Sequence, residues 1–548
     1  MRFSLPDPRE GSTRLSLVHH AGRIHEQPRR IGAGSAAILF LLAFIASVLL
    51  FSRANDFPYY YHPDEPGKVK QLQSGKRNFH HPQLLLNTAT VGKVLTGSPD
   101  DPQQLVMIGR WCSALFAAAA VGLVAVFAAR HAGLSAGVGT AGILSVNALL
   151  AEGAHFFKED TALAFGFAAF CVAISYFADR ASLMRLLFLA LATVAALSAK
   201  WIGVLVLPFG LLAVQTVERR AGGAPSWPLW LSPVAVYVAV VVGGFIAVNF
   251  QVLVDLRQAF GGLGLEVNKL LDNPLGVQHR IPNLYGWRTM LHFTPWLVLG
   301  FAAIAVTSPV LLRRRPRLAE AIILMLFAVY GVSLMFTGKV AERYSMPLVV
   351  LLAPLAMMGA SWTVQRLTDW SSSPIRNGVV GLLTLLVAAA AVLAEIPLYR
   401  SLQVDLETDT RFDLAQFVRT ELPPAAIIVQ DKKVKLPDPD RPDENVYNVV
   451  LPQRIITARG SGLAADVGDI DSLRAQGVTH VAIAEADWSP YFASGKFVEG
   501  LSDPESVRRR DFYRFLFDET RRVWHAPSGE AWYVRQGISL YDIQPTGQ

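Results

Sequence analysis

The residues best suited to chemistry are two adjacent carboxylates, Asp64 and Glu65, in the segment Tyr59-Tyr60-Tyr61-His62-Pro63-Asp64-Glu65-Pro66. The prolines fix their own φ angles and restrict the residues before them, so this turn is stiff. It follows a long apolar run, where ionisable groups are costly unless they have a function. We therefore predict that Asp64 and Glu65 are catalytic and that His62 contacts a substrate.

A simpler interpretation is that Asp64 only caps a short helix over residues 65–74, which Gly75 would end. Capping does not require a second carboxylate, nor a proline on either side of the pair. We therefore favour the catalytic interpretation.

A second acidic segment, Glu152-Gly-Ala-His155-Phe-Phe-Lys158-Glu159-Asp160, follows the third apolar run. On a helix, positions 152, 155 and 159 share one face and could ligate a divalent metal ion. Alternatively, Glu159 and Asp160 complement the positive end of the helix that follows. The sequence leaves both open, so His155, Lys158, Glu159 and Asp160 are candidates for contacting a metal ion or an acceptor.

Basic residues form two further polar islands. Lys339 and Arg343 are four residues apart, so they share one side of a helical turn, with Glu342 and Tyr344 beside them. They could grip a phosphate, which the planar guanidinium fork suits, or snorkel at a membrane interface. We favour the phosphate. Lys200 lies where two shortened apolar helices meet, and it must face a polar cavity or the membrane surface.

The pair His80-His81 precedes Pro82 in the same polar segment as the acidic turn. Both histidines are candidate substrate contacts. The alternative is that they only shape the loop beside the proline.

The composition explains why these polar islands are notable. Of 548 residues, 52% are hydrophobic and only 17% are charged, which is typical of a membrane protein. The net charge of +7 comes from short arginine clusters between apolar runs, so we read it as a topology signal and expect no nucleic acid partner. Both cysteines, Cys112 and Cys171, lie inside apolar runs, which argues against disulfides and thiolate metal sites.

We expect three regions. Residues 1–31 form a basic cytoplasmic tail, residues 32–399 a membrane domain of about eleven spans, and residues 400–548 a soluble domain. The outer loops of the membrane domain are 52–103, 152–160, 251–289 and 337–344. All the polar islands then lie on the outer face, and the strong arginine clusters lie on the other. The third of these loops begins with an amphipathic stretch suited to the membrane interface.

The composition after about residue 400 is that of a soluble α/β domain. Apolar runs at 426–429, 480–483 and 532–534 predict strands, and 409–422, 471–476 and 505–517 predict helices. An odd number of spans places this domain outside the cytoplasm. Its Arg459-Gly-Ser-Gly462 is too weak a pattern for a nucleotide site.

Four motifs together resemble the GT-C glycosyltransferases that use polyprenyl-phosphate sugars: Tyr61-His-Pro-Asp-Glu65, Phe157-Lys-Glu-Asp160, Lys200-Trp201 and Glu342-Arg-Tyr-Ser-Met-Pro347. The nearest resemblance is to protein O-mannosyltransferases and to the bacterial lipid A transferases for aminoarabinose and galacturonic acid. It covers about residues 33–400 and implies that Asp64 is the general base. It also implies that Arg343 and Lys200 bind the donor phosphate. The C-terminal domain has no specific relative, so the acceptor stays unnamed.

The sequence thus predicts a polytopic α-helical enzyme of the bacterial cytoplasmic membrane. It would transfer a sugar from a polyprenyl-phosphate carrier to an extracytoplasmic acceptor hydroxyl on a lipid, protein or glycan. One base opposite the leaving group predicts inversion at the anomeric carbon. The alternative is a transporter or lipid flippase with a periplasmic binding domain, but such proteins carry their ionisable groups near the bilayer midplane and often show internal repeats.

Overall fold

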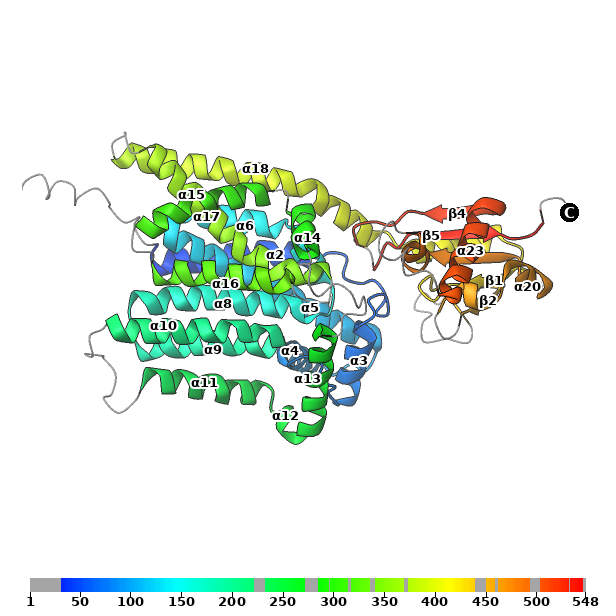
Figure 1. Cartoon of the computed structure of the whole chain (residues 1–548), viewed down its shortest axis with the longest axis horizontal. Coiled ribbons are helices and arrows are strands. Elements are labelled where there is room, and N and C mark those ends of the chain that lie inside the picture. The colour runs from blue at the N-terminus through cyan, green and yellow to red at the C-terminus, as the bar shows by residue number, and fades with distance from the viewer. Residues whose placement is uncertain are drawn as a thin grey trace, which may run out of the picture.

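A bundle of long helices and a small sheet domain at one end of it make up the molecule (Figure 1). The computed structural model describes residues 31–220, 232–271, 284–294, 296–313, 317–335, 341–368, 373–438, 450–458, 462–492, 503–531 and 533–545. The basic tail 1–30, Lys339, the central arginines of 313–317 and most of Arg459-Gly-Ser-Gly462 lie outside these residues.

Among the described residues, seven helices are long and apolar enough to cross a membrane. They are α2 (Ala33–Phe51), α5 (Pro102–Ala132), α8 (Glu159–Asp179), Trp201–Arg219 with most of α10 (Val206–Arg220), α16 (Leu318–Met335), Glu342–Leu367 with α17 (Met346–Leu367), and α18 (Ser373–Glu407). The protein is therefore a multi-pass membrane protein.

Two bent helix pairs raise this number to nine if each pair is one span. The first joins α6 (Leu134–Ser145) to α7 (Ala148–His155), and the second joins α14 (Tyr285–Phe293) to α15 (Leu297–Arg313). Two shorter apolar helices, α9 (Leu183–Ala199) and α11 (Pro233–Val248), lie alongside the others (Figure 1). The described helices thus give seven to nine spans by length and composition, and the predicted eleven requires α9 and α11 to cross the membrane as well.

Burial separates the central helices from the peripheral ones. The apolar windows of α5 and α8 are 78% and 83% buried, whereas those of α2 and α18 are only 28% buried. In α5, alanine and glycine let neighbouring helices approach closely, as is usual when helices pack in a membrane. The site described below is attached to this rigid centre.

The predicted helix break at Lys200 is confirmed. Lys200 has an extended backbone between α9 and the short 3-10 helix η2 (Trp201–Leu205). Four short helices lie at the same end of the bundle as the sheet domain: α3 (Glu65–Ser74), α4 (Leu84–Leu95), α13 (Leu256–Leu271) and α14 (Figure 1). Leu253 in α12 (Gln251–Val254) and Leu256 and Phe260 in α13 are exposed, as expected of interfacial helices.

The C-terminal part is an α/β domain, as predicted. Its sheet has the strand order β2-β1-β3-β5-β4, with β1 (Ile427–Gln430), β2 (Arg454–Thr457) and β3 (His480–Ala484) parallel. The strands β4 (Arg521–Ala526) and β5 (Ile538–Asp542) complete the sheet in antiparallel fashion. The main helices are α19 (Thr410–Glu421), α20 (Ile470–Ala475), α21 (Glu485–Trp488) and α23 (Pro504–Glu519).

One strand prediction is wrong. Tyr533 and Val534 lie in a turn between β4 and β5 and not in a strand. They are buried or half-buried because the turn packs against the membrane domain, with the Tyr533 ring 4.3 Å from that of His62. Helix α18 runs without interruption to Glu407, past the predicted domain boundary at 400, and so connects the two parts directly.

Candidate active site

The stiff turn of the first outer loop presents Asp64 at the start of α3. Asp64 occupies the N-cap position but its side chain makes no capping hydrogen bond. Its backbone N–H donates to the His62 Nδ1 at 3.2 Å, and its carboxylate forms an ion pair with Lys158 of the second outer loop. The capping interpretation therefore does not describe Asp64, which points towards the other polar islands.

Glu65 points the other way. Its carboxylate receives two hydrogen bonds from Arg110 of α5, at 3.0 and 2.6 Å, and one from the Phe157 backbone N–H at 2.9 Å. Both charged side chains are completely buried. Next to Arg110, a Cβ on Gly109 would lie 2.2 Å from the Phe157 ring, so glycine is needed for this close packing. Glu65 thus joins the first loop, α5 and the second loop, and it lines neither cavity described below.

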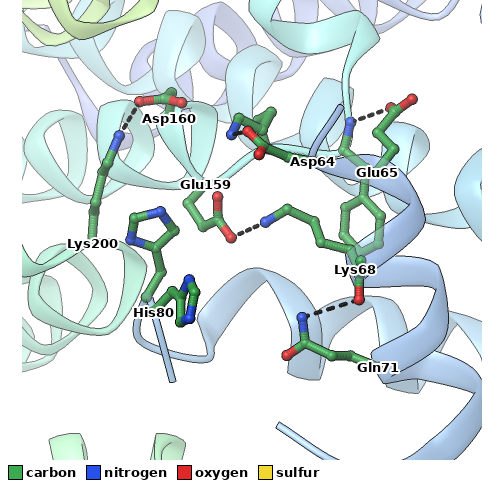
Figure 2. A network of polar contacts seen from close by, with 12 residues as sticks. Asp64, Glu65, Lys68, Gln71, His80, Glu159, Asp160 and Lys200 are labelled. Carbon is green, nitrogen blue, oxygen red and sulfur yellow. Dashed lines mark hydrogen bonds and ion pairs between the residues drawn. The ribbon is translucent and has the colours of Figure 1, made fainter. Parts of the chain in front are cut away.

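Two lysines pair with acids across the two loops (Figure 2). Lys158 holds Asp64, and Lys68 of α3 holds Glu159 at the start of α8. Burial alone would raise the pKa of Asp64, but the Lys158 ammonium, assisted by Arg343, holds the pKa of this carboxyl well below its usual range. Asp64 is therefore ionised at neutral pH.

Asp160 gathers the basic residues of two other loops. Lys200 lies 2.6 Å from one carboxylate oxygen (Figure 2), and the Arg343 Nε lies 3.5 Å from the other. The Tyr344 ring is 4.4 Å from the Lys200 ammonium and 5.4 Å from the Arg343 guanidinium, distances typical of cation–π contacts. The structure thus brings together residues that are about 180 positions apart in the sequence.

The cluster has more cations than anions. Five basic side chains surround four carboxylates: Lys68, Lys158, Lys200, Arg110 and Arg343 around Asp64, Glu65, Glu159 and Asp160. Burial, with the Lys158 charge as the next cause, lowers the pKa of His62 well below its usual value, so His62 is neutral. On the side of the cluster that Lys68, Lys158, Lys200 and Arg343 line, the acidic partners are Asp64 and Glu159, so an anion placed on that side would be stabilised.

Two cavities meet at this cluster, and Lys158 and Arg343 line both of them. The first, of about 470 Å³, is lined by Glu152, Asp160, Glu342 and Glu530, and we name it the acidic cavity. The second, of about 460 Å³, adds Lys68 and Lys200 to the shared cations and is lined by two carboxylates, Asp64 and Glu159. We name it the basic cavity.

The remaining predicted site residues are divided between these cavities. His62 lines the acidic cavity, whereas His80, His81 and Tyr344 line the basic one. His155 lines neither cavity, because its ring nitrogens lie 2.6 and 2.7 Å from the carbonyl oxygens of Ala151 and Arg53. Lys339 lies outside the described residues.

The metal hypothesis for the second outer loop finds no assembled ligand set. Helix α7 ends at His155 and α8 begins at Glu159, so positions 152, 155 and 159 do not share a helical face. Across the part of the chain that the structure describes, no group of three or more His, Cys, Asp or Glu side chains is arranged to hold a metal ion.

Sequence reasoning missed Lys68, Arg110 and Tyr533. Lys68 follows Glu65 by three residues in α3, so its helical proximity to the acidic turn was a usable signal. Arg110 is a lone arginine inside an apolar span, which is itself a signal of function or buried pairing. Tyr533 has no such signal, because the chain separates it from the acidic turn by more than 400 positions.

Comparisons with known proteins support the fold. No protein-family model matches this chain, and no curated protein matches it either. Among solved structures, it is similar to the archaeal oligosaccharyltransferase AglB from Archaeoglobus fulgidus in complex with an inhibitory peptide and a dolichol-phosphate, with a TM-score of 0.51. The two are 11% identical over 91% of this chain and 80% of AglB.

Two other solved structures match with lower scores. ArnT from Cupriavidus metallidurans bound to undecaprenyl phosphate is 14% identical to this chain. The match covers 93% of this chain and 98% of the ArnT chain, with a TM-score of 0.47. An Archaeoglobus fulgidus oligosaccharyltransferase in complex with Zn and sulfate is 13% identical to this chain. That match covers 84% of this chain and 70% of the oligosaccharyltransferase chain, with a TM-score of 0.48. At these identities the likeness to AglB concerns the fold alone, and it agrees with the predicted polytopic helical membrane protein that carries a C-terminal α/β domain.

Proposed function

We propose that this protein is a membrane glycosyltransferase that takes a sugar from a polyprenyl-phosphate carrier and gives it to an acceptor hydroxyl outside the cytoplasm. The observation that carries the proposal is the position of Asp64. This ionised carboxylate lines the basic cavity, where four cations face two carboxylates, and it is paired with Lys158, which lines both cavities. A base next to an anion site is what this transfer requires.

The donor phosphate belongs in the basic cavity. Four cations line it, Lys68, Lys158, Lys200 and Arg343, against two carboxylates. The acidic cavity offers only two of these cations, Lys158 and Arg343, beside four acidic side chains, so a phosphate would be held less well there. Arg343 can hold two phosphate oxygens at once, and Lys200 and Lys158 add point charges. The acceptor then enters from the acidic cavity and reaches the anomeric carbon from the opposite side.

Transfer is a single displacement. The acceptor oxygen attacks the anomeric carbon and gives its proton to Asp64, while the bond from that carbon to the phosphate oxygen breaks. The leaving phosphate keeps the bonding electron pair, and Lys158, Lys200 and Arg343 stabilise its growing charge. With one base and a good leaving group, the configuration at the anomeric carbon is inverted.

Lys158 links donor binding to base strength. While it is paired with Asp64, the low pKa of that carboxyl makes it a weak base. A phosphate in the basic cavity competes for the same ammonium. As Lys158 turns towards the phosphate, the pKa of Asp64 rises towards its ordinary value and the carboxylate becomes a better proton acceptor. Glu65 stays paired with Arg110 and keeps Asp64 in place.

The cellular setting follows from the same proposal. The two cavities lie at the end of the bundle that carries the C-terminal domain, which we place outside the cytoplasmic membrane of a bacterium, with the N-terminus inside. The acceptor is a hydroxyl of a lipid, protein or glycan. A divalent metal ion has no assembled ligand set among the described residues, and no step of this proposal uses one.

The test is a reconstituted transfer reaction. The purified protein in nanodiscs receives a polyprenyl-phosphate sugar with a labelled sugar, together with membrane lipids and envelope proteins from cells that lack the gene. We expect label in a new product and release of polyprenyl phosphate. Mass spectrometry of lipids and glycoproteins from cells with and without the gene identifies that product. If the carrier moves across the membrane without losing its sugar, the protein is a flippase and the proposal is wrong.

A further inference from the structure

The C-terminal domain contributes an aromatic residue to the wall of the acidic cavity. Tyr533 lines this cavity together with Gly529 and Glu530. Its ring lies 4.3 Å from that of His62 and 5.5 Å from that of Phe156. Both of these residues belong to outer loops of the membrane domain, on either side of the Asp64–Lys158 pair. A residue of the soluble domain is thus part of the site.

Tyr533 is close to Arg343, a cation that lines both cavities. The Tyr533 hydroxyl accepts a hydrogen bond from the Arg343 guanidinium, and both residues line the acidic cavity. Arg343 also pairs with Asp160, but its Nε makes no hydrogen bond within the site. The Tyr533 hydroxyl therefore helps to fix the position of the Arg343 guanidinium.

The turn that carries Tyr533 is anchored on both sides of it. The carboxylate of Asp405 in α18 accepts hydrogen bonds from the Glu530 N–H, before Tyr533, at 2.5 Å and from the Arg535 guanidinium, after it, at 2.6 Å. Asp405 is 1% exposed. A Cβ on Gly529 would lie 2.2 Å from this carboxylate, so only glycine allows the turn to approach.

The second anchor connects the turn to the catalytic loop. Arg411 of α19 donates to the carbonyl oxygens of Tyr533 and Val534 at 3.0 and 3.2 Å. Its guanidinium also lies 4.0 Å from the ring centre of Tyr61, whose hydroxyl donates to Asp409 at 2.7 Å. Tyr61 precedes Asp64 by three residues, so one arginine fixes both the Tyr533 turn and the acidic turn.

We propose that Tyr533 is a positioning residue of the transferase site, through which the C-terminal domain orients Arg343 for the donor phosphate and holds His62 beside Asp64. This proposal rests on the proposed function. It predicts that the C-terminal domain is required for catalysis itself, in addition to any role in binding the acceptor. A phenylalanine at this position keeps the ring contacts with His62 and Phe156 and removes only the hydrogen bond to Arg343.

The experiment compares Tyr533→Phe with Tyr541→Phe, a matched change in strand β5 of the same domain. Two measurements are made in nanodiscs: the Kd of polyprenyl phosphate without a sugar, and the KM and kcat of sugar transfer. A hydrogen bond to a charged group is worth roughly tenfold or more in affinity. We expect Tyr533→Phe to weaken polyprenyl phosphate binding about tenfold and to lower kcat, with an unchanged melting temperature. Tyr541→Phe should match the wild type.

Arg411→Lys is the second variant, because it keeps the charge but loses the fork that holds the two carbonyl oxygens. It should reproduce the Tyr533→Phe defect. If Tyr533→Phe binds polyprenyl phosphate and transfers sugar like the wild type, Tyr533 is only a packing residue and this inference is overturned. If the wild type binds polyprenyl phosphate but transfers no sugar, the proposed function fails, and the binding measurement still tests Tyr533 on its own.

Discussion

At the scale of single residues, the site is a set of ion pairs that a substrate must rearrange. Asp64, Glu159 and Asp160 each hold a cation, and Asp160 has two, Lys200 and Arg343. The pairs of Glu159 and Asp160 are buried, and breaking a buried pair without replacing it costs about 3–5 kcal/mol; the Asp64 side chain is 46% exposed, so its pair is worth less. The phosphate diester of the donor carries one negative charge, so it can replace one carboxylate as the partner of these cations. The site is therefore stable when empty and ready to exchange partners when the donor arrives.

Lys158 gives the reaction a distinctive pH dependence. Its burial, and next the Arg343 charge, lower the pKa of Lys158 below the ordinary lysine value of 10.5. The ammonium that holds the phosphate is therefore lost as the pH rises through this lowered pKa. We expect kcat/KM for the donor to fall on the alkaline side below pH 10.5, and to stay flat on the acid side down to about pH 5, because the pKa of Asp64 is lowered too.

The measurement is a pH–rate profile in nanodiscs for the wild type and for Lys158→Arg, whose charge persists to high pH. In Lys158→Arg, the fall of kcat/KM on the alkaline side should occur at a higher pH than in the wild type. Lys68 faces the same cavity and its pKa is lowered by burial and by Lys158, so Lys68→Arg is measured in parallel. The exposed Lys70→Arg is the control. If only Lys68→Arg shifts the alkaline fall of kcat/KM to a higher pH, the group that loses its proton there is Lys68 and not Lys158.

Arg343 is predicted to grip the phosphate with two nitrogens. Arg343→Lys keeps the charge but loses this geometry, so it should weaken donor binding and slow turnover together, and Arg343→Ala should be worse. Arg366, exposed at the other end of the same helix, provides the control variant Arg366→Ala. Donor affinity and single-turnover rate are the measurements. Wild-type values for Arg343→Ala would mean that this arginine only anchors the helix at the membrane interface.

At the scale of secondary-structure elements, the site depends on how short outer segments attach to α5 and α8. The pair Glu65–Arg110 ties α3 to the middle of the bundle, and the Phe157 backbone joins it. Helix α8 begins one residue after Lys158, so the acidic pair Glu159 and Asp160 lies at the positive end of its dipole. The alternative interpretation of this acidic pair, that it complements the positive end of the helix, is thus compatible with ion pairing.

Glu65→Gln tests the attachment. It leaves the fully buried Arg110 guanidinium without its charged partner, at a cost of roughly 3–5 kcal/mol. We expect a clearly lower melting temperature in detergent, with activity reduced because Asp64 loses its support. Asp56→Asn, in the exposed part of the same loop, should leave the melting temperature and the activity unchanged. A Glu65→Gln variant that melts like the wild type but cannot transfer sugar would make Glu65 a reacting group.

The elements themselves were largely predictable from the sequence. Apolar runs of about 20 residues give the spans directly, because the bilayer core sets that length. The strand predicted at 532–534 failed because the apolar side chains of Tyr533 and Val534 face another domain, which a local pattern cannot distinguish from a sheet. Strands β2 and β4 were missed, since Arg454, Arg521 and Arg522 dilute the apolar signal, and β5 was missed although it contains no arginine.

The site was predictable only in part. The charged islands Asp64, Lys200 and Arg343 stand out against apolar neighbours, so residue type alone identifies them. Their pairing does not follow from the sequence, because the loops that bring Lys158 to Asp64 and Asp160 to Arg343 are connected by spans whose packing order is a property of the whole bundle.

At the scale of the whole molecule, one end of the bundle holds the site and the C-terminal domain (Figure 1). Helix α18 carries the chain from the membrane into this domain, and Asp405 near its end fixes the turn beside the acidic cavity. Tyr61 and Asp409 form a further contact between the two parts. The arrangement requires that the site, the outer loops and the domain all lie on the same side of the membrane.

Reporter fusions test this orientation. A reporter that is active only outside the cytoplasm should be active when it is fused after Gln548. The same reporter fused after Arg366, at the end of α17, should be inactive, because we predict that this end faces the cytoplasm. An inactive but stably expressed fusion after Gln548 would place the C-terminal domain and the site in the cytoplasm, and the predicted number of spans would be wrong by one.

The most direct test of the central claim is a single-turnover experiment on Asp64→Asn. Asparagine keeps the shape of the side chain but cannot accept the acceptor's proton, and general-base catalysis is worth about 10²-fold or more. The measurement follows release of the labelled sugar from its polyprenyl-phosphate carrier, together with donor affinity, for Asp64→Asn and for the control Asp56→Asn. We predict that Asp64→Asn binds the donor at least as tightly as the wild type, because Lys158 is released for the phosphate, and transfers sugar at least about 100-fold more slowly. Transfer by Asp64→Asn at the wild-type rate would contradict the assignment of Asp64 as the base.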